Sequence, residues 1–237
     1  MSFLPLERLC SGASELGIEL TNHQLDQLDR FAEFLVEINL KFNLTRITDP
    51  EDIVTSHYLD SLTCLAALNV EPGERVMDVG AGAGFPGIPI KIARPDINLT
   101  LLEATRKKVD FMNDAIGLLG LKDANAMHGR AEKIGHDPAC RERFGIVYAR
   151  ALSGMKVLVE LCLPLVRVGG YVVAQKSSGI EEELAAAQPM IGQLGGRIER
   201  TPAIHIPGTD IARTLVVISK TKPTPERFPR AYSKIVG

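Results

Sequence analysis

The residues best suited to chemistry lie in a glycine-rich stretch, VMDVGAGAGFPGIPIKI, at residues 76–92. A short apolar run is followed by Gly80, Gly82, Gly84 and Gly87, and then by apolar residues at helical spacing. Glycines permit positive φ angles and a close approach to a ligand, and the first amides of the next helix are unpaired donors. The pattern predicts a strand, a tight turn and a helix start that together hold a cofactor.

Two kinds of cofactor fit this turn. Gly82, Gly84 and Gly87 match the dinucleotide pattern G-x-G-x-x-G, which alone is a weak signal. Glu103 lies where an acid accepts hydrogen bonds from a ribose diol, a group that NAD and S-adenosylmethionine share. Asp78, just before the turn, suits a cofactor with a cationic amino-acid end, because a carboxylate would oppose a pyrophosphate at the helix N-terminus. The turn therefore favours S-adenosylmethionine.

The elements that must position the turn alternate between strand and helix after residue 73. We expect strands at 75–79, 98–103, 124–128, 144–149, 171–175, 197–205 and 214–220, and helices at 86–93, 106–119, 155–168 and 180–194, the last kinked or ended by Pro189. Such alternation predicts a parallel sheet covered on both faces. No helix separates the last two strands, so they should form an antiparallel pair at the sheet's edge. The expected class is α/β, with a Rossmann-like, mostly parallel seven-stranded sheet of the class I methyltransferase kind and an antiparallel terminal strand.

The first seventy residues predict a helical extension. Thr21 can cap a helix whose apolar residues recur at three- and four-residue steps up to Phe42. Asp49-Pro50 then starts a second helix, expected to end near residue 67, on which His57, Asp60 and Ser61 share one face. We therefore divide the chain into an N-terminal helical extension, 1–70, and a cofactor-binding domain, 71–237.

The composition is that of a globular protein. The 237 residues are 45% hydrophobic and 24% charged, enough to bury a sizeable core. The sequence shows neither a signal peptide nor a membrane span, so we expect a cytoplasmic protein. The four cysteines form no C-x-x-C pair or Cys/His cluster, which favours buried free thiols and no metal.

The charge is distributed unevenly along the chain. Residues 1–37 carry seven acids and two bases, whereas residues 211–237 carry six bases and one acid. A basic end is an electrostatic hint of nucleic-acid binding. A solvated tail explains the same charges equally well.

Five motifs occur together in one order: NLTRITDPEDIVTSHYLDSL, VMDVGAGAGFPGIPIKI, FGIVYARALS, QKS and RTLVVI. In that order and spacing they resemble the RsmG (GidB) family, bacterial enzymes that use S-adenosylmethionine to methylate N7 of a guanine in 16S ribosomal RNA. The similarity runs from about Leu25 to Lys220. The chain departs modestly at Ala81 and Phe85, where the family often has threonine and leucine.

The resemblance also implies site residues. It assigns cofactor binding to Gly80, Gly82, Phe85, Glu103, Ala131, Glu132 and Arg150, with Glu103 near the ribose and 131–132 against the adenine. Arg150 would reach the methionine end or the incoming guanine and act by positioning. Substrate RNA would contact Asn39, Asn43, His57, Lys176 and Arg213, with Lys220 and Lys222 on phosphates. Each of these has a structural alternative: a turn cap for Asn43, a buried polar pair for His57 with Asp60, and a solvated strand end for Lys176.

Guanine N7 carries a lone pair and no proton, so its methylation needs no general base. Catalysis should rest on positioning and electrostatics.

The expected partner is 16S rRNA, naked or within a small-subunit particle, and the expected oligomeric state is a monomer. Two other functions remain open: an NAD-linked oxidoreductase, and a non-catalytic RNA- or ribosome-binding protein on the same scaffold.

Overall fold

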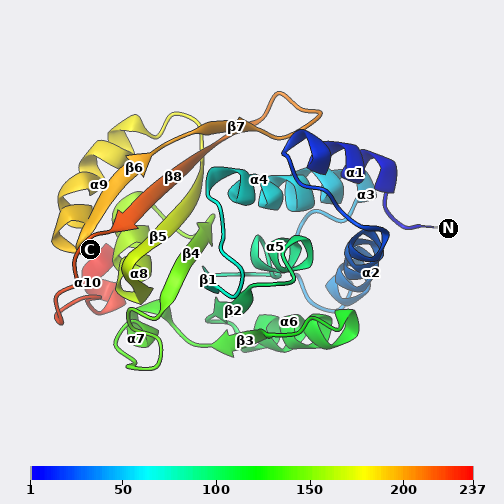
Figure 1. The fold of residues 1–237 in the computed structure, drawn as a ribbon. Coiled ribbons are helices and arrows are strands. Elements are labelled where there is room, and N and C mark those ends of the chain that lie inside the picture. Colours follow the sequence, from blue (N-terminus) through cyan, green and yellow to red (C-terminus); the bar gives the residue numbers. More distant parts are fainter. Residues whose placement is uncertain (1, 237) are drawn as a thin grey trace.

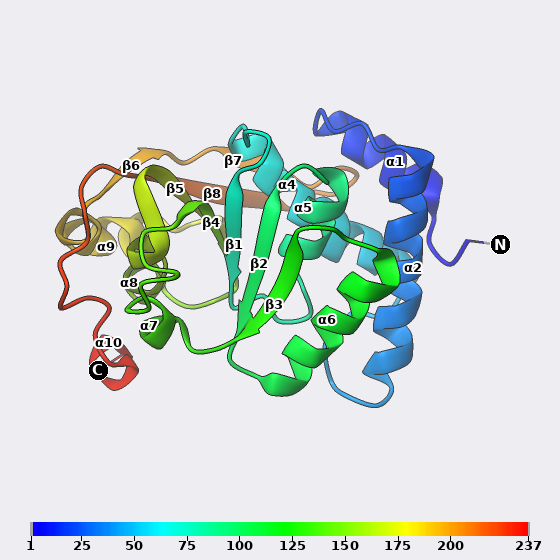
Figure 2. The same ribbon diagram turned by 60° about the horizontal axis from the view of Figure 1, so that its bottom comes forward.

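The computed structural model describes residues 2–236 as one sheet with helices on both faces (Figures 1 and 2). The strands are β1 (Arg75–Val79), β2 (Asn98–Glu103), β3 (Ala124–His128), β4 (Phe144–Arg150), β5 (Val166–Ser177), β6 (Gly196–Arg200), β7 (Ala203–His205) and β8 (Ala212–Lys220). The α-helices are α1 (Leu6–Glu15), α2 (Asn22–Asn39), α3 (Pro50–Asp52), α4 (Asp60–Ala67), α5 (Gly87–Ala93), α6 (Arg106–Leu119), α7 (Ala131–Ile134), α8 (Met155–Cys162), α9 (Glu181–Gln193) and α10 (Tyr232–Val236).

The strand order is β3-β2-β1-β4-β5-β8-β6, with β7 also paired to β8. Strands β1 to β5 are parallel to one another, and β8 is antiparallel to β5, β6 and β7. The expected α/β class and antiparallel terminal strand are confirmed. The chain reverses its direction of progress across the sheet between β1 and β4, where ligands bind in sheets of this kind.

Three expected elements differ in detail. The strand expected at 197–205 is interrupted at Thr201-Pro202, so the sheet has eight strands where seven were predicted. The helix expected at 155–168 ends at Cys162, because Pro164 has no amide to continue the helical bonds; a 3₁₀ turn (Leu163–Leu165) leads directly into β5. Pro189 does not end α9, which continues through it to Gln193.

Alternate residues of the sheet enter two separate cores. In β1, Val76 packs with α2, α5 and α6, whereas Met77 packs with α8 and α9 on the other face. This is the period of two expected for a strand buried on both sides. Figure 2 shows α2, α5 and α6 on one side of the sheet and α7, α8 and α9 on the other.

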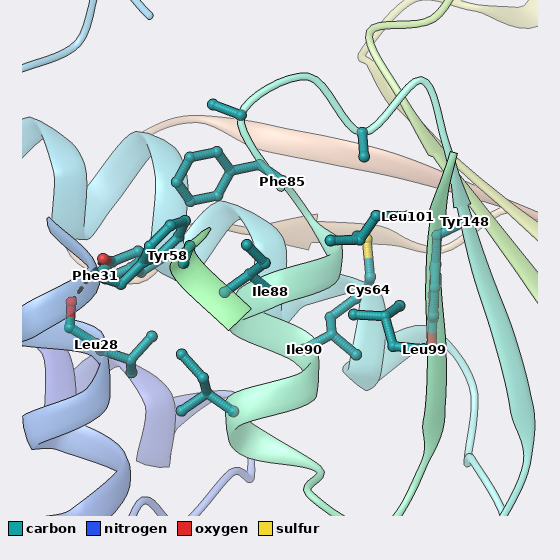
Figure 3. Packing of buried hydrophobic residues seen from close by; sticks show 14 of the residues in the cluster. Leu28, Phe31, Tyr58, Cys64, Phe85, Ile88, Ile90, Leu99, Leu101 and Tyr148 are labelled. Carbon is teal, nitrogen blue, oxygen red and sulfur yellow. Dashed lines mark hydrogen bonds between the residues drawn. The ribbon is translucent and has the colours of Figure 1, made fainter. Parts of the chain in front are cut away.

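The N-terminal helices share the first of these cores with the sheet. Figure 3 shows Phe31 of α2 and Tyr58 against Phe85 and Ile88, with the Tyr58 hydroxyl donating to the Leu28 carbonyl at 2.7 Å. Helix α2 begins with the expected cap, in which Thr21 and the side chain of the residue three positions later satisfy each other's backbone amides. The extension is therefore packed into the main hydrophobic core.

A π-helical segment, Ile53–Leu59, joins α3 to α4. The sequence predicted one regular helix here, and the extra residue per turn changes which side chains share a face. π-helical segments occur preferentially at functional sites, and this one carries His57 directly before Asp60 at the start of α4. None of the helices described between residues 2 and 236 combines the length and apolar character needed to cross a bilayer.

Candidate functional site

The glycine turn after β1 has the backbone that its sequence predicts. Gly80, Gly82 and Gly84 have φ angles of 74°, 60° and 92°, a region that other residues rarely adopt. Gly87 is needed for a different reason. A Cβ there would lie 2.3 Å from Leu101 Cδ2 and 3.0 Å from Asp78 Oδ2, so α5 starts closer to the sheet than any side chain allows.

Asp78 is fully buried behind the turn. Its Oδ2 accepts a hydrogen bond from the Gly87 amide at 2.9 Å, and its Oδ1 has no partner among the described residues. Burial raises the pKa of the Asp78 carboxyl to about 7, although the bond from Gly87 acts in the opposite sense. In the structure this carboxyl fixes the start of α5. Its contact with a cationic cofactor group stays a prediction.

Glu103, at the end of β2, braces the same turn. Its Oε2 accepts from the Gly82 amide at 3.1 Å, and its Oε1 accepts from the Thr105 amide at 2.8 Å. The side chain is almost buried yet still borders a cavity. Glu103 thus holds Gly82 in place and presents a carboxylate to whatever occupies that cavity.

The first cavity lies at the carboxyl ends of β1 to β4 and has a volume of about 250 Å³. Three expected cofactor residues besides Glu103 line it: Gly80, Ala131 and Glu132. Apolar side chains, including Leu102 and Leu161, form much of the remaining wall. A carboxylate for a diol, apolar walls for a flat base and a side-chain-free turn fit S-adenosylmethionine.

A second cavity, of about 540 Å³, opens on the other side of the end of β4. It is lined by Ile47, Ser56, His57, Asp60, Arg150, Ala151, Gln175, Lys176, Ser177 and Arg213. These residues come from the N-terminal extension, from the ends of β4 and β5 and from the start of β8. The fold therefore brings together four residues that the sequence assigned to substrate or catalysis: His57, Arg150, Lys176 and Arg213.

Asp60 organises this second cavity. Its Oδ2 accepts from Arg150 Nη1 at 2.7 Å, and its Oδ1 accepts from Arg213 Nε at 2.6 Å and Gln175 Nε2 at 3.0 Å. The carboxylate is nearly inaccessible to solvent, so one buried negative charge orients two arginines from different strands. The sequence placed Asp60 on the same face as His57 but did not predict this arrangement.

His57 does not pair with Asp60, so that structural alternative was wrong. Its ring stacks on Phe85, with the ring centroids 4.2 Å apart, and its Nε2 lies 3.0 Å from Thr45 Oγ1. Burial, and secondly the charge of Arg150, lower the pKa of His57 to about 3. The imidazole is therefore neutral at physiological pH.

Phe85 lies behind the second cavity. The Arg150 guanidinium is 5.5 Å from the centre of its ring, and Phe31 packs against it from the core. Phe85 is not among the residues that line the first cavity. Its expected contact with the cofactor stays a prediction, and its observed role is to support His57 and Arg150.

The two cavities meet at Ala151, which lines both of them. Ala151 follows directly after β4 and has a φ of 51°, an uncommon conformation for a residue with a side chain. Backbone of this kind tends to occur at functional sites. The end of β4 thus forms the boundary between a cofactor-shaped space and a space rich in arginine.

The remaining predicted RNA contacts have mixed outcomes. Asn39 holds the loop after α2, because its Oδ1 accepts from the amides of Leu44 at 2.8 Å and Thr45 at 3.0 Å. Asn43 is exposed on that loop. Lys176 is not a free strand end, since its Nζ donates to Glu183 at 2.8 Å and to the Ser153 carbonyl at 3.1 Å.

The prediction that Lys220 contacts phosphate was wrong. Its side chain is fully buried, and its Nζ donates to Leu163 O at 2.7 Å and to Thr224 Oγ1, with Glu142 at 3.1 Å. Two other bases of the tail are also paired with acids: Arg213 with Asp60 and Arg230 with Glu160. Lys220 pairs with Glu142. Half of the six bases in the basic tail therefore serve internal ion pairs, which weakens the electrostatic argument for nucleic acid drawn from the tail alone.

Three cysteines are buried free thiols as expected, Cys64, Cys140 and Cys162, and Cys10 is partly exposed. Within residues 2–236, no group of three or more His, Cys, Asp or Glu side chains is placed to hold a metal ion.

Several residues that line the two cavities were not predicted from the sequence, among them Gln175, Arg130 and Tyr232. Gln175 and Arg130 lie at strand ends, which is a usable signal; Tyr232 lies in a tail with no motif.

Comparison with known proteins agrees with this geometry. Residues 24–212 match the model of the GidB family, described as rRNA small subunit methyltransferase G. A "Ribosomal RNA small subunit methyltransferase G" from Pelotomaculum thermopropionicum is 46% identical over 94% of each chain, and one from Lachnoclostridium phytofermentans is 43% identical over 94% of this chain and 92% of its own. A chain from a Haloferax volcanii complex of the Trm112 activator with a putative methyltransferase has a TM-score of 0.59 at 13% identity, covering 81% of this chain and 98% of that one, which shows a shared fold. The chain therefore belongs to the GidB family, rRNA small subunit methyltransferase G.

Proposed function

We propose that this protein transfers the methyl group of S-adenosylmethionine to N7 of a guanine in 16S ribosomal RNA. The observation that carries the proposal is the meeting of the two cavities at Ala151. The first cavity has the carboxylate, glycine turn and apolar walls that suit the cofactor. The second is bordered by Arg150 and Arg213, which suit a polyanionic substrate. The names of the 46% and 43% identical relatives support the same reading.

The residues of the second cavity fit a reaction that needs no general base. When bound, S-adenosylmethionine supplies an activated methyl group on a sulfonium sulfur, and guanine N7 offers a lone pair without a proton. Asp60 is occupied by two arginines and a glutamine, so it is poorly placed to accept a proton. His57 is neutral and held against Phe85 and Thr45. The protein's contribution is then positioning and electrostatics.

Arg150 is the residue best placed to orient the guanine. Arginine commonly binds guanine through both O6 and N7, but N7 must stay free if it is to be methylated. Arg150 Nη1 is engaged by Ser56 O and Asp60, while its Nη2 and Nε have no acceptor among residues 2–236. We assign one of these free donors to guanine O6, which leaves N7 facing the first cavity.

The other site residues follow from the two cavities. For the cofactor we propose Gly80 and Gly82 through the turn backbone, Glu103 at the ribose, and Ala131 and Glu132 at the base. For RNA we propose Arg213 and Lys176 at the rim of the second cavity, with the exposed Asn43 beyond it and the exposed Lys222 past the opposite end of β8. Asn39 would act indirectly, by holding the loop that carries Asn43.

The N-terminal extension contributes to only one of the two cavities. Residues 1–70 supply His57 and Asp60 to the second cavity and nothing to the first. We propose that this extension forms part of the substrate side of the enzyme, and that residues 71–237 form the cofactor domain and the rest of the substrate side. We also propose that the protein acts as a monomer. An enzyme acting on ribosomal RNA would work in the cytoplasm, where its substrate is found.

The test is methylation of defined substrates by the purified protein. Small-subunit particles and naked 16S rRNA, both from cells lacking this activity, are incubated with methyl-labelled S-adenosylmethionine. The RNA is then digested and its nucleosides are identified by mass spectrometry. We expect 7-methylguanosine in at least one substrate, and the comparison identifies which form of RNA is used. Labelled RNA without 7-methylguanosine would disprove the assignment to N7.

Cofactor-dependent stabilisation separates the proposal from the other two functions. S-adenosylhomocysteine should raise the unfolding temperature, and NADH should not, because a ligand that binds only the native state stabilises it. The reverse result would support an oxidoreductase. Binding of both S-adenosylhomocysteine and RNA, with no methyl transfer to either form of the substrate, would support a non-catalytic RNA-binding protein.

A further inference from the structure

The C-terminal tail returns to the first cavity. After β8 ends at Lys220, the chain crosses the face that carries α8 and finishes in the short helix α10, beside α8 (Figure 1). Tyr232, the first residue of α10, lines the first cavity together with Leu161 of α8 and the segment 129–132 after β3. Tyr232 and the tail that carries it lie beyond position 212, where the match to the family model ends.

The tail is held to α8 by an ion pair whose acid is buried. Arg230 donates through Nε to Glu160 Oε1 at 2.8 Å and through Nη2 to Oε2 at 2.7 Å, and its backbone amide also donates to Oε1 at 2.9 Å. Glu160 has no exposure to solvent. Bidentate pairs of this kind fix geometry as well as contributing energy. Glu160 directly precedes Leu161, so the anchor lies beside the cavity wall.

A second anchor holds the preceding part of the tail. Arg141 donates to the carbonyls of Gly135 at 2.7 Å, Phe228 at 2.8 Å and Thr224 at 2.8 Å. His136 Nε2 lies 2.7 Å from the carbonyl of Pro229. The tail is thus pinned to the segment that follows α7 as well as to α8. These contacts stop two residues before Tyr232 and bring its ring to the cavity.

Tyr232 as a residue is 41% exposed although it borders a cavity with apolar walls. Part of this large aromatic side chain is therefore still accessible and could be covered by a ligand in the cavity. Because the reactive methyl must face Ala151, where the second cavity begins, the purine of the cofactor must lie at the far end, toward residues 129–132. A flat aromatic base stacks favourably on an aromatic side chain.

We propose that Tyr232 is a cofactor-binding residue whose ring covers the purine of S-adenosylmethionine, so that the C-terminal tail completes the cofactor site. This inference rests on the proposed function, because it takes the first cavity as the site of that cofactor. It adds to the cofactor site a side chain that lies outside the segment matched by the family model. It also gives the Arg230–Glu160 pair a purpose, which is to deliver Tyr232 to the cavity.

The protein contains no tryptophan, which permits a direct spectroscopic test. In the full-length Tyr232→Trp variant, the single indole should change its fluorescence as S-adenosylhomocysteine is added, and the change should saturate. The matched control is Val236→Trp, which places the indole on the same short helix at an exposed position that does not line the cavity. We expect no saturable change there. Equal responses from the two variants would overturn the proposal.

Affinity provides an independent measurement. Calorimetric titration with S-adenosylhomocysteine should show about tenfold weaker binding for Tyr232→Ala and nearly unchanged binding for Tyr232→Phe, which keeps the ring. RNA binding without cofactor should be the same in both variants. If the unaltered protein binds S-adenosylhomocysteine and Tyr232→Ala binds it equally well, Tyr232 has no such role. If the unaltered protein does not bind it, the proposed function itself fails.

Discussion

Arg213 Nε donates a 2.6 Å hydrogen bond to Asp60 Oδ1, joining residues 153 positions apart in the sequence. Asp60 begins α4 in the N-terminal extension, and Arg213 lies in the last strand of the sheet. Because the other oxygen of the same carboxylate holds Arg150, one acid sets the distance between two arginines that flank the second cavity. The substrate side of the site depends on this single buried charge.

Asp60→Asn should therefore weaken methyl transfer to RNA strongly while leaving the affinity for S-adenosylhomocysteine almost unchanged. The change removes the charge that both arginines face, and breaking such a buried pair costs about 3 kcal/mol of folding stability. Denaturant unfolding, calorimetric titration and labelled methyl transfer measure the three effects. Asp26→Asn is the control, because its pair with Arg30 is exposed and 4.0 Å long and should contribute less than about 0.5 kcal/mol. Loss of cofactor affinity in Asp60→Asn would contradict the division between the cavities.

Gly82→Asp should abolish cofactor binding. Gly82 has a φ of 60°, and its amide donates to Glu103, so a second carboxylate would be introduced beside the first and inside the turn. Arg213→Ala should have the opposite profile, with cofactor affinity retained and activity on RNA reduced. Calorimetric titration and methyl-transfer assays on both variants distinguish the two. Gly117→Ala in α6, where a Cβ meets no atom within 4 Å, controls for adding a side chain to a glycine.

Lys220→Met should lower stability without weakening RNA binding. The buried ammonium serves Leu163 O, Thr224 Oγ1 and Glu142, and removing it leaves these acceptors without their partner. The expected loss is about 2–3 kcal/mol in the free energy of unfolding, measured with denaturant. Lys222→Met, at an exposed position, should give the reverse pattern: unchanged stability and slightly weaker RNA binding at low salt. Weaker RNA binding in Lys220→Met with normal stability would restore the phosphate role.

His57 should make stability sensitive to acid. Its pKa falls from 6.5 in the unfolded chain to about 3 in the folded protein, so between these values the unfolded chain holds a proton that the folded protein does not. The free energy of unfolding therefore falls as pH falls below 6.5, by about 2 kcal/mol at pH 5 from this residue.

His57→Phe keeps an aromatic ring against Phe85 and should flatten that dependence. Denaturant unfolding of both proteins from pH 7.5 to pH 5 gives the difference directly. Asp78 acts in the opposite sense, because its folded pKa is raised to about 7 and its stabilising protonation is lost as pH rises. The difference between the two proteins isolates His57, since Asp78 is common to both. Parallel curves would show that His57 does not carry the effect.

Local patterns in the sequence were sufficient for most of the sheet. The strand and turn from Arg75 to Gly84 combine an apolar run with glycines, and both signals are local. Pro202 could have indicated that residues 197–205 form two strands. A proline is also compatible with a continuous strand at a sheet edge, so the sequence did not decide between the two. The early end of α8 at Cys162 depends on Pro164 and on the position at which β5 begins. The start of β5 is in turn set by the strands that pair with it, which are distant in the sequence.

The site was less accessible to prediction, because its main relationships are long-range. The strand-end position of Arg150 could be predicted, but its shared acceptor with Arg213 requires the N-terminal helices to be packed against the sheet. The π-helical segment alters the faces on which His57 and Asp60 lie, and no residue type signals it. From its position in a basic tail, Lys220 was predicted to be a surface base. A lysine can be buried only where acceptors such as carbonyls surround its ammonium group, and the acceptors of Lys220 come together only in the folded chain.

The position of Asp60 in the N-terminal extension has a consequence for redesign. Four of the residues that line the pocket for the acceptor come from residues 1–70, whereas none of the residues that line the cavity for the methyl donor does. Exchanging residues 1–70 for those of a relative, together with the arginines that Asp60 orients, would therefore be the most economical way to redirect the methyl group to a different nucleotide. The residues that line only the first cavity could remain unaltered in such a chimaera.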